Sequence, residues 1–115
     1  MVMVAVSAQG STPDDGVDLR FGRAAGFMVY DTAKSEWGYL PNGISRGLPQ
    51  GAGLAATEIL ARAGIRVVLT GTVGPKASSA LRAARIVFRE NAVGGTVRQA
   101  VAEYLAAQNL DEALA

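Results

Sequence analysis

Two arginines flank a Phe-Gly pair in the segment DLRFGRAAGFMVYD, residues 18–31, and this is the first place where chemistry could be concentrated. Arg20, Phe21, Gly22 and Arg23 bring two positive charges and an aromatic ring together in four residues. A guanidinium is planar, weakly hydrated and always charged, and the hydrogen bonds that it donates are about twice as strong as neutral ones. The segment is therefore a candidate anion-binding loop. The alternative interpretation is a solvated arginine pair beside a core phenylalanine.

A second candidate is GTVGPKAS, residues 71–78, which lies between an apolar strand-like run and a helical pattern. Free N–H groups and a partial positive charge at a helix N-terminus favour anions, and Lys76 adds a full charge. Gly71 and Gly74 permit close approach of the backbone. The spacing is not that of a Walker A loop, so we do not expect ATP binding. The alternative is a glycine-rich turn with a surface lysine.

The chain contains no cysteine and no histidine. Thiolate ligands, disulfides, cysteine-bound iron–sulfur clusters and imidazole ligands are therefore excluded. A bound metal has to arrive with its own ligands, as it does in a thiometallate cluster, which is also a soft anion. A nuclease needs several carboxylates around divalent metals. Asp14, Asp15, Asp18 and Asp31 are present, but three of them lie in one turn-forming loop, and we do not expect a nuclease.

The composition is that of a compact domain. Of the 115 residues, 50% are hydrophobic and 18% are charged, which excludes a disordered chain. The net charge of +1 does not indicate a nucleic-acid-binding protein. The N-terminus lacks the basic region of a signal peptide, and no apolar run is long enough to span a membrane. We expect a cytoplasmic protein with neither a nucleic-acid partner nor a membrane partner.

Hydrophobic patterning predicts eight elements in the order β-β-β-α-β-α-β-α. Strands are expected at 1–7, 26–31, 36–42, 65–71 and 85–89. The first predicted helix ends at Gly64, and its apolar stripe comprises Ala56, Ile59, Leu60 and Ala63. The second begins near Pro75, and its buried face comprises Ala77, Ala80, Leu81 and Ala84. The third begins at Thr96, which forms a capping box with Gln99, and its apolar stripe comprises Val97, Ala100, Val101, Tyr104 and Leu105. Residues 43–53 are predicted to form a mobile glycine-rich loop. The tail either frays or docks through Leu110 and Leu114. The sequence therefore predicts one α/β domain over residues 1–115, with a mixed five-stranded sheet flanked by helices.

The phrases RFGRAAGFMVYD, GAGLAATEILARAGIRVVLTGTVGPKASSALRAARI and GGTVRQAVAEYL resemble the dinitrogenase iron–molybdenum cofactor biosynthesis family over nearly the whole chain. The resemblance implies a three-layer ribonuclease-H-like fold. It also implies a protein that binds, carries or helps assemble molybdenum- or iron-containing sulfide clusters. Many members carry a histidine where this chain has Arg20, so direct imidazole ligation is not expected. The chain looks most similar to small members that carry a molybdenum–copper sulfide cluster without covalent attachment.

Together these features predict a non-enzymatic protein that holds an anionic molybdenum–copper or iron–molybdenum sulfide cluster. The expected pocket is bordered by residues 19–24, 43–53 and 71–77. Arg20, Arg23 and Lys76 are predicted to neutralise the cluster; the predicted contacts from the ring and the backbone come from Phe21, Gly22, Gly71 and Gly74. Other cluster-handling proteins or ATPases are the expected protein partners. The alternative function is an adaptor module for protein interactions that binds no metal.

Overall fold

The computed structural model describes residues 2–92 and 95–114 and contains one five-stranded sheet in the order β3-β2-β1-β4-β5. Strand β1 (Met3–Ala8) is central. It pairs antiparallel with β2 (Gly26–Asp31), which pairs antiparallel with the edge strand β3 (Glu36–Pro41). On its other side β1 pairs in parallel with β4 (Val67–Leu69), and β4 pairs in parallel with the edge strand β5 (Val87–Arg89). This confirms the predicted mixed sheet, although β4 and β5 are shorter than their apolar patterns suggested.

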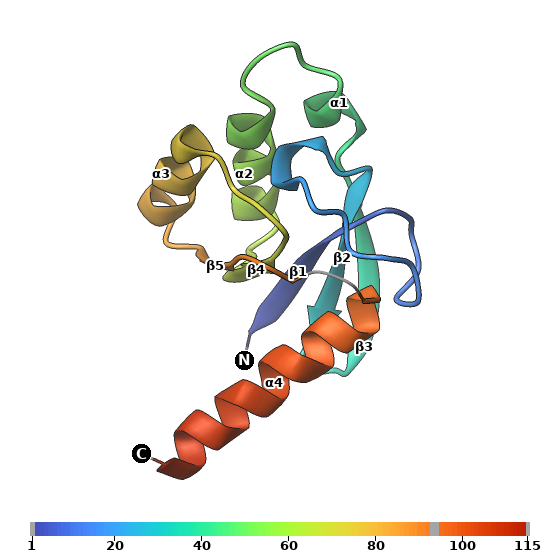
Figure 1. Cartoon of the computed structure of the whole chain (residues 1–115), viewed down its shortest axis with the longest axis vertical. Helices are drawn as coiled ribbons and strands as arrows, with labels where there is room; N and C mark the ends of the chain where they lie inside the picture. The colour runs from blue at the N-terminus through green and yellow to red at the C-terminus, as the bar shows by residue number, and fades with distance from the viewer. Residues whose placement is uncertain (1, 93–94, 115) are drawn as a thin grey trace.

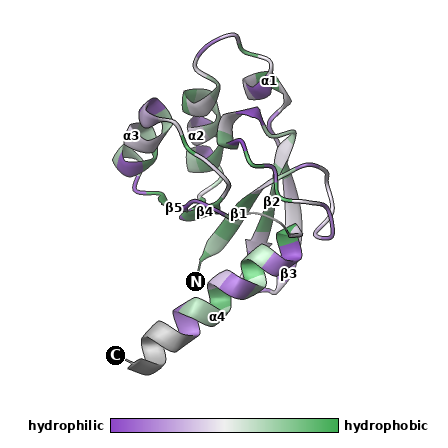
Figure 2. Ribbon diagram, in the orientation of Figure 1, coloured by the Kyte–Doolittle hydropathy of each residue, from purple (hydrophilic) through white to green (hydrophobic). Residues whose placement is uncertain are grey.

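Helices cover both faces of the sheet, as Figure 1 shows. Helices α2 (Ala52–Arg62) and α3 (Pro75–Ala83) pack on one face, where Phe27, Leu60 and Val68 belong to one buried cluster. Helix α4 (Val97–Leu114) packs on the other face, where Val6 and Val101 belong to a second cluster. In Figure 2 the apolar residues of β1 form a continuous band, whereas α4 alternates between apolar and polar residues. The three-layer arrangement is confirmed; the ribonuclease-H-like assignment stays a prediction.

Helix α4 begins with the predicted capping box. The Thr96 N–H donates to Gln99 Oε1 at 2.9 Å, and the Gln99 N–H donates to Thr96 Oγ1 at 3.1 Å. Val97 and Val101 of the predicted stripe are buried, and the remaining members are half-buried. The predicted docking through Leu110 and Leu114 concerns side chains from residue 110 onward, which lie outside the described part of the structure. Across the part of the chain that is described, no helix is both long and apolar enough to cross a membrane.

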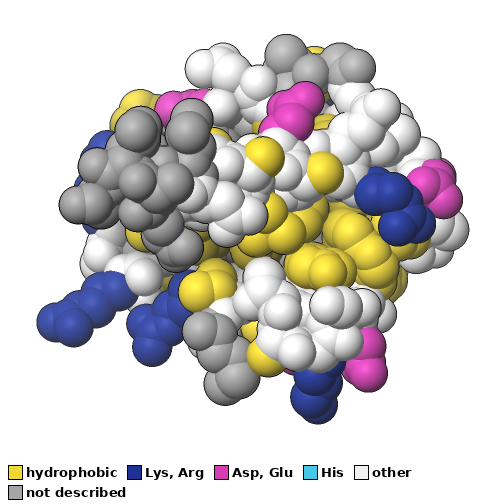
Figure 3. Space-filling model, turned by 90° about the horizontal axis from the view of Figure 1, so that it is seen from below, with side chains coloured by type: hydrophobic (Ala, Val, Ile, Leu, Met, Phe, Trp, Pro, Cys, Tyr) yellow, Lys and Arg dark blue, Asp and Glu magenta, His cyan; other side chains and the backbone are white. Residues whose placement is uncertain are grey.

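The N-terminal half of α4 is held by aromatic and charged contacts. The Trp37 ring lies 4.8 Å from the Tyr30 ring and 5.9 Å from the Arg98 guanidinium of α4. Arg98 also donates to Asp14 at 3.0 Å, and this hydrogen bond raises the pKa of the guanidinium above its ordinary value. When the molecule is seen from below, hydrophobic side chains gather near the centre of its surface (Figure 3). The contacts tie α4 to the antiparallel half of the sheet.

The prediction of an irregular loop over residues 43–53 is wrong at both of its ends. Residues 43–46 form the short helix α1 (Gly43–Arg46), and α2 begins at Ala52 rather than near Ala56. The buried Asn42 side chain donates to the carbonyls of Gly22 and Ala24 at 3.2 and 3.0 Å. This anchor holds the start of α1 against the Phe-Gly-Arg segment, a long-range contact that no local pattern encodes.

Candidate anion-binding site

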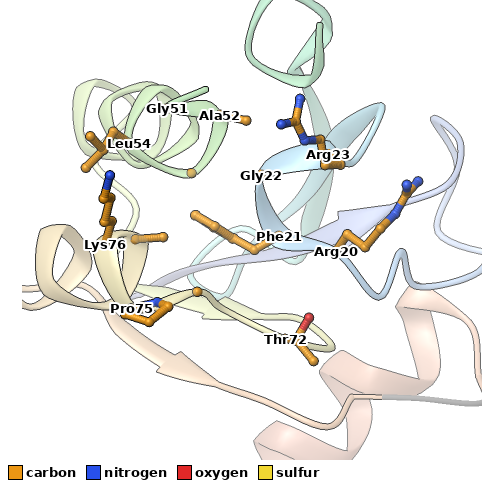
Figure 4. A pocket seen from close by; sticks show the side chains of 13 residues that line it. Arg20, Phe21, Gly22, Arg23, Gly51, Ala52, Leu54, Thr72, Pro75 and Lys76 are labelled. Atoms are coloured by element: carbon orange, nitrogen blue, oxygen red, sulfur yellow. The ribbon is translucent and has the colours of Figure 1, made fainter. Parts of the chain in front are cut away.

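A pocket of about 520 Å³ opens where three segments meet: the 3₁₀ turn η1 (Phe21–Arg23), the start of α2 and the turn that leads into α3. Its lining comprises Arg20, Phe21, Gly22, Arg23, Gly51, Ala52, Gly53, Leu54, Thr72, Gly74, Pro75, Lys76 and Ala77. Six of the seven predicted site residues line this pocket; Gly71 does not. Of the predicted border 43–53, only Gly51, Ala52 and Gly53 line the pocket. Figure 4 shows the pocket from close by.

The residues before η1 are joined to the turn between β4 and α3 by a short parallel bridge between Arg20 and Thr72. The Thr72 N–H donates to the Leu19 carbonyl at 2.8 Å, and the Phe21 N–H donates to the Thr72 carbonyl at 3.3 Å. A Cβ at Gly71 would overlap the Leu19 carbonyl oxygen, so only glycine permits this approach. Gly71 therefore positions the two borders of the pocket against each other instead of lining it.

The η1 turn packs directly on the backbone at the start of α2. A Cβ at Gly22 would lie 2.7 Å from the Gly53 nitrogen and 2.9 Å from the Ala52 carbonyl carbon. Gly53 in turn lies against Ala77 of α3. Small residues at these positions bring η1 and the first turns of α2 and α3 together around one space.

Two helix N-termini therefore line the same pocket, and neither is capped by a side chain. The first intrahelical bonds are those from Ala55 to Gly51 and from Ser78 to Gly74. The N–H groups of the residues before Ala55 and Ser78 thus have no intrahelical acceptor. Neither helix carries an acidic residue in its first turn. Both ends present free donors and a partial positive charge to the pocket.

Arg20 and Lys76 line opposite ends of the pocket, with Phe21 between them, and the Arg20 side chain extends away from Phe21 (Figure 4). The Arg20 side chain is 64% exposed, and its Nε lies 3.6 Å from Oδ1 of the buried Asp18. The same oxygen accepts the Arg20 N–H at 2.9 Å. Lys76 forms no ion pair with any described residue. Of the two charges, that of Lys76 is the less neutralised.

Arg23 has a different arrangement from Arg20. Its Nη1 donates to the Arg46 carbonyl at 3.0 Å and to the Leu48 carbonyl. Figure 4 shows its side chain directed toward α1, away from Phe21. Arg23 borders the pocket, but it also fastens the end of α1 to the η1 turn. No sequence pattern indicates this second role, because the two carbonyl acceptors lie more than twenty residues away.

Phe21 forms an apolar floor to the pocket. Its side chain is 1% exposed, and its ring centroid lies 5.6 Å from that of Phe27. The alternative interpretation of Phe21 as a core residue is thus correct for most of its surface. Leu54, Pro75 and Ala77 extend the apolar lining. The pocket combines apolar walls with positive ends, which suits a large, weakly hydrated anion better than a small hydrated one.

Each of the four aspartates that were considered as nuclease ligands has a hydrogen-bond or ion-pair partner in the structure. Asp14 pairs with Arg98, and Asp15 accepts two hydrogen bonds from Thr12. Asp18 pairs with Arg20, and Asp31 accepts the N–H groups of the turn that follows β2. Among the side chains that the structure describes, no three Asp, Glu, His or Cys residues are placed to hold a metal ion.

Of the residues that line the pocket, only Leu54 lies outside the three borders predicted from the sequence. Thr72 was not singled out within its border, and the first turn of α2 was predicted as loop instead of helix. The available signal was GAG at residues 51–53, just before a helical pattern. Those glycines were assigned to the loop because the apolar stripe begins only at Ala56. Gly51 adopts a left-handed φ of 77° as the N-cap, which allows α2 to begin immediately after it.

The chain matches the model of the family described as dinitrogenase iron-molybdenum cofactor over residues 2–107. It is 50% identical to the apo form of the orange protein from Desulfovibrio gigas, covering 94% of this chain and 90% of that chain with a TM-score of 0.91. It is 28% identical to a putative NifB protein from Thermotoga of the DUF35 family, covering 92% and 89% with a TM-score of 0.80. A search of curated proteins found no match. These similarities confirm the predicted resemblance.

Proposed function

Because the chain belongs to the dinitrogenase iron–molybdenum cofactor family, we propose that its pocket holds an anionic metal–sulfide cluster as non-covalent cargo. Homology supports cluster binding or cluster biosynthesis. The finer statements are our proposal: the cargo is a molybdenum–copper sulfide cluster, and the protein carries it without catalysing a reaction. The relative from Desulfovibrio gigas was solved in an apo form, which designates a protein without its bound group.

The observation that carries the proposal is the contrast among the three long helices. Helix α4, remote from the pocket, has a complete capping box. Helices α2 and α3 have no side-chain cap, and their first turns line the pocket. Uncapped N–H groups are costly unless water or a ligand accepts their hydrogen bonds. An anion in the pocket accepts them from two helices at once.

The chemistry of the lining fits a sulfide-wrapped cluster. The sulfides of a thiometallate already occupy the coordination positions of its metals, so no thiolate or imidazole from the protein is required. This matches a chain without cysteine or histidine. Sulfide surfaces are polarisable and spread their negative charge, and they suit the apolar contacts from Phe21, Leu54 and Ala77. Lys76 and Arg20 would balance the charge at the two ends.

The test is reconstitution of the apo protein with tetrathiomolybdate and copper, followed by gel filtration. The wild type is expected to retain the charge-transfer absorbance of the cluster. The double variant Arg20→Ala/Lys76→Ala is expected to bind about tenfold to hundredfold more weakly, because it lacks two charge-assisted contacts of roughly 1 kcal/mol each. Added salt should weaken binding, since screening shortens the range of charge attraction to about 8–10 Å.

The matched control is Lys34→Ala/Arg62→Ala, which removes two exposed positive charges outside the pocket. This control is expected to bind like the wild type. Equal retention of the cluster by the wild type and the Arg20/Lys76 variant would remove these side chains from the site. Failure of the wild type to retain any thiometallate would contradict the carrier function itself and favour the adaptor alternative.

A further inference from the structure

A group of exposed arginines lies at the β5 edge, at the margin of the sheet next to α3. Arg66 precedes β4, Arg82 and Arg85 lie at the end of α3 and just after it, and Arg89 ends β5. None of the four forms an ion pair with any residue that the structure describes. No Asp or Glu occurs between residues 59 and 89 of the sequence. Several Lys and Arg side chains project at the left of Figure 3, the side on which α3 and β5 lie in Figure 1.

The backbone of β5 is open along its outer side. The Val87 N–H donates to the Arg66 carbonyl at 2.9 Å, and the Arg89 carbonyl accepts the Thr70 N–H at 3.0 Å. In a parallel ladder alternate residues bond to the same neighbour. Since Val87 and Arg89 bond to β4, the N–H and C=O of Phe88 point away from the sheet. These two groups are available to a further strand.

Apolar surface accompanies the free backbone groups. A groove of about 550 Å³ is lined by Arg82, Arg85, Ile86, Val87 and Phe88. Val87 is 45% exposed, although it lies in a strand. The Arg82 guanidinium lies 5.4 Å from the centre of the Phe88 ring, so its charge is held at the wall of the groove. The nearest acid in sequence, Glu90, accepts the Val73 N–H at 2.9 Å at the far end of β5.

We propose that the β5 edge binds an extended, acidic segment of a partner protein, which adds a strand beside β5. Backbone pairing with Phe88 would fix the segment, acidic side chains would face the arginines, and apolar side chains would cover Val87. A second copy of this chain is disfavoured, because its own edge carries the same positive charge. Nucleic acid is disfavoured, because it has no peptide groups for the open edge and the chain as a whole carries a charge of only +1. This surface is separate from the cluster pocket and does not depend on it.

The experiment uses the full ¹⁵N-labelled chain and, as the probe, an acetylated eight-residue peptide that alternates glutamate and valine. The amide shifts of residues 82–90 are expected to move, and hydrogen exchange at the Phe88 amide is expected to slow at least tenfold. The slowing should diminish at high salt. A peptide with lysine in place of glutamate should produce neither effect.

Arg85→Gln/Arg89→Gln is the test variant, because it removes two charges without disturbing the stacked Arg82. It is expected to bind the acidic peptide at least tenfold more weakly. The matched control Arg46→Gln/Arg62→Gln removes two exposed arginines elsewhere and should bind like the wild type. The proposal is wrong if Phe88 exchange is unchanged, if both double variants lose affinity equally, or if the lysine peptide binds as well. Displacement of the acidic peptide by an oligothymidylate of equal charge would favour a nucleic-acid partner and would also overturn the proposal.

Discussion

At the scale of single residues, the two arginines around Phe21 look equivalent in the sequence but have different surroundings in the structure. Arg20 is mostly exposed and is partly balanced by Asp18. Arg23 donates to two carbonyls near the end of α1. Hydrogen bonds from a charged group to uncharged acceptors are stronger than neutral ones. Arg23 therefore stabilises the segment that leads into α2, whereas the mostly exposed Arg20 side chain donates to no backbone carbonyl among the described residues.

Substitution of Arg23 by methionine tests this difference. Arg23→Met keeps an unbranched apolar stem but removes both hydrogen bonds. We expect a loss of about 1–3 kcal/mol in the free energy of unfolding and faster amide exchange over residues 43–50. Arg20→Met is the matched control and should change stability by less than about 1 kcal/mol, as exposed ion pairs do. Urea unfolding and hydrogen exchange measure both quantities, and equal effects of the two substitutions would contradict the assignment.

At the scale of elements, the N-terminus of α3 lacks the features that normally stabilise a helix end and carries one that destabilises it. Lys76 is exposed in the first turn, where a positive charge opposes the helix macrodipole. Acidic residues and side-chain caps, which normally stabilise this position, are absent there. The same absence holds at the start of α2. An anion bound between the two helix ends would supply the missing negative charge.

Reversing the charge of Lys76 should therefore separate stability from binding. Lys76→Glu is expected to raise the free energy of unfolding of the apo protein by about 0.3–1 kcal/mol, because a carboxylate favours a helix N-terminus. The same variant should bind thiometallate at least about tenfold more weakly, since a repulsive charge replaces an attractive one. Lys34→Glu makes the same charge change in the turn between β2 and β3 and should leave binding unchanged. Thermal unfolding and titration with tetrathiomolybdate test the two effects, and a stable variant with undiminished binding would exclude Lys76 from the site.

The elements also show how far the sequence was sufficient. The predicted span of β2 agrees with the structure at both ends, and the α4 cap agrees in both hydrogen bonds, because a short apolar run and a capping box are local signals. The prediction for residues 43–53 was wrong because α1 is held by hydrogen bonds from Asn42 and Arg23, whose partners are distant in sequence. The pocket was predicted in outline from glycines and charges. The border 43–53 was predicted as loop, and Leu54 was left out of the pocket, because the first turn of α2 is positioned by packing against Gly22, a contact that forms only in the folded chain.

At the scale of the whole molecule, the core is complete without the proposed cargo. The two buried clusters are built from β1, β2, β4 and the helices, and Phe21 already packs against Phe27. We expect the apo protein to unfold cooperatively, unlike small zinc domains that unfold when the metal is removed. Thiometallate should raise the midpoint of thermal unfolding in proportion to the logarithm of its concentration. Calorimetry of apo and loaded protein measures this, and a molten apo state would contradict it.

The lining of the pocket, composed of backbone amides, apolar groups and the side chains of Arg and Lys, has a consequence for turnover. No side chain there has to be deprotonated before loading, reduced after exposure to oxygen, or freed from a bond to metal at unloading. If the pocket carries the proposed cluster, a molecule that has released it would be chemically identical to one that has never bound it. Such a carrier would be able to bind a new cluster immediately. The rates of loading and release would then depend on the proteins that supply and accept the cluster, because the carrier itself needs no chemical regeneration.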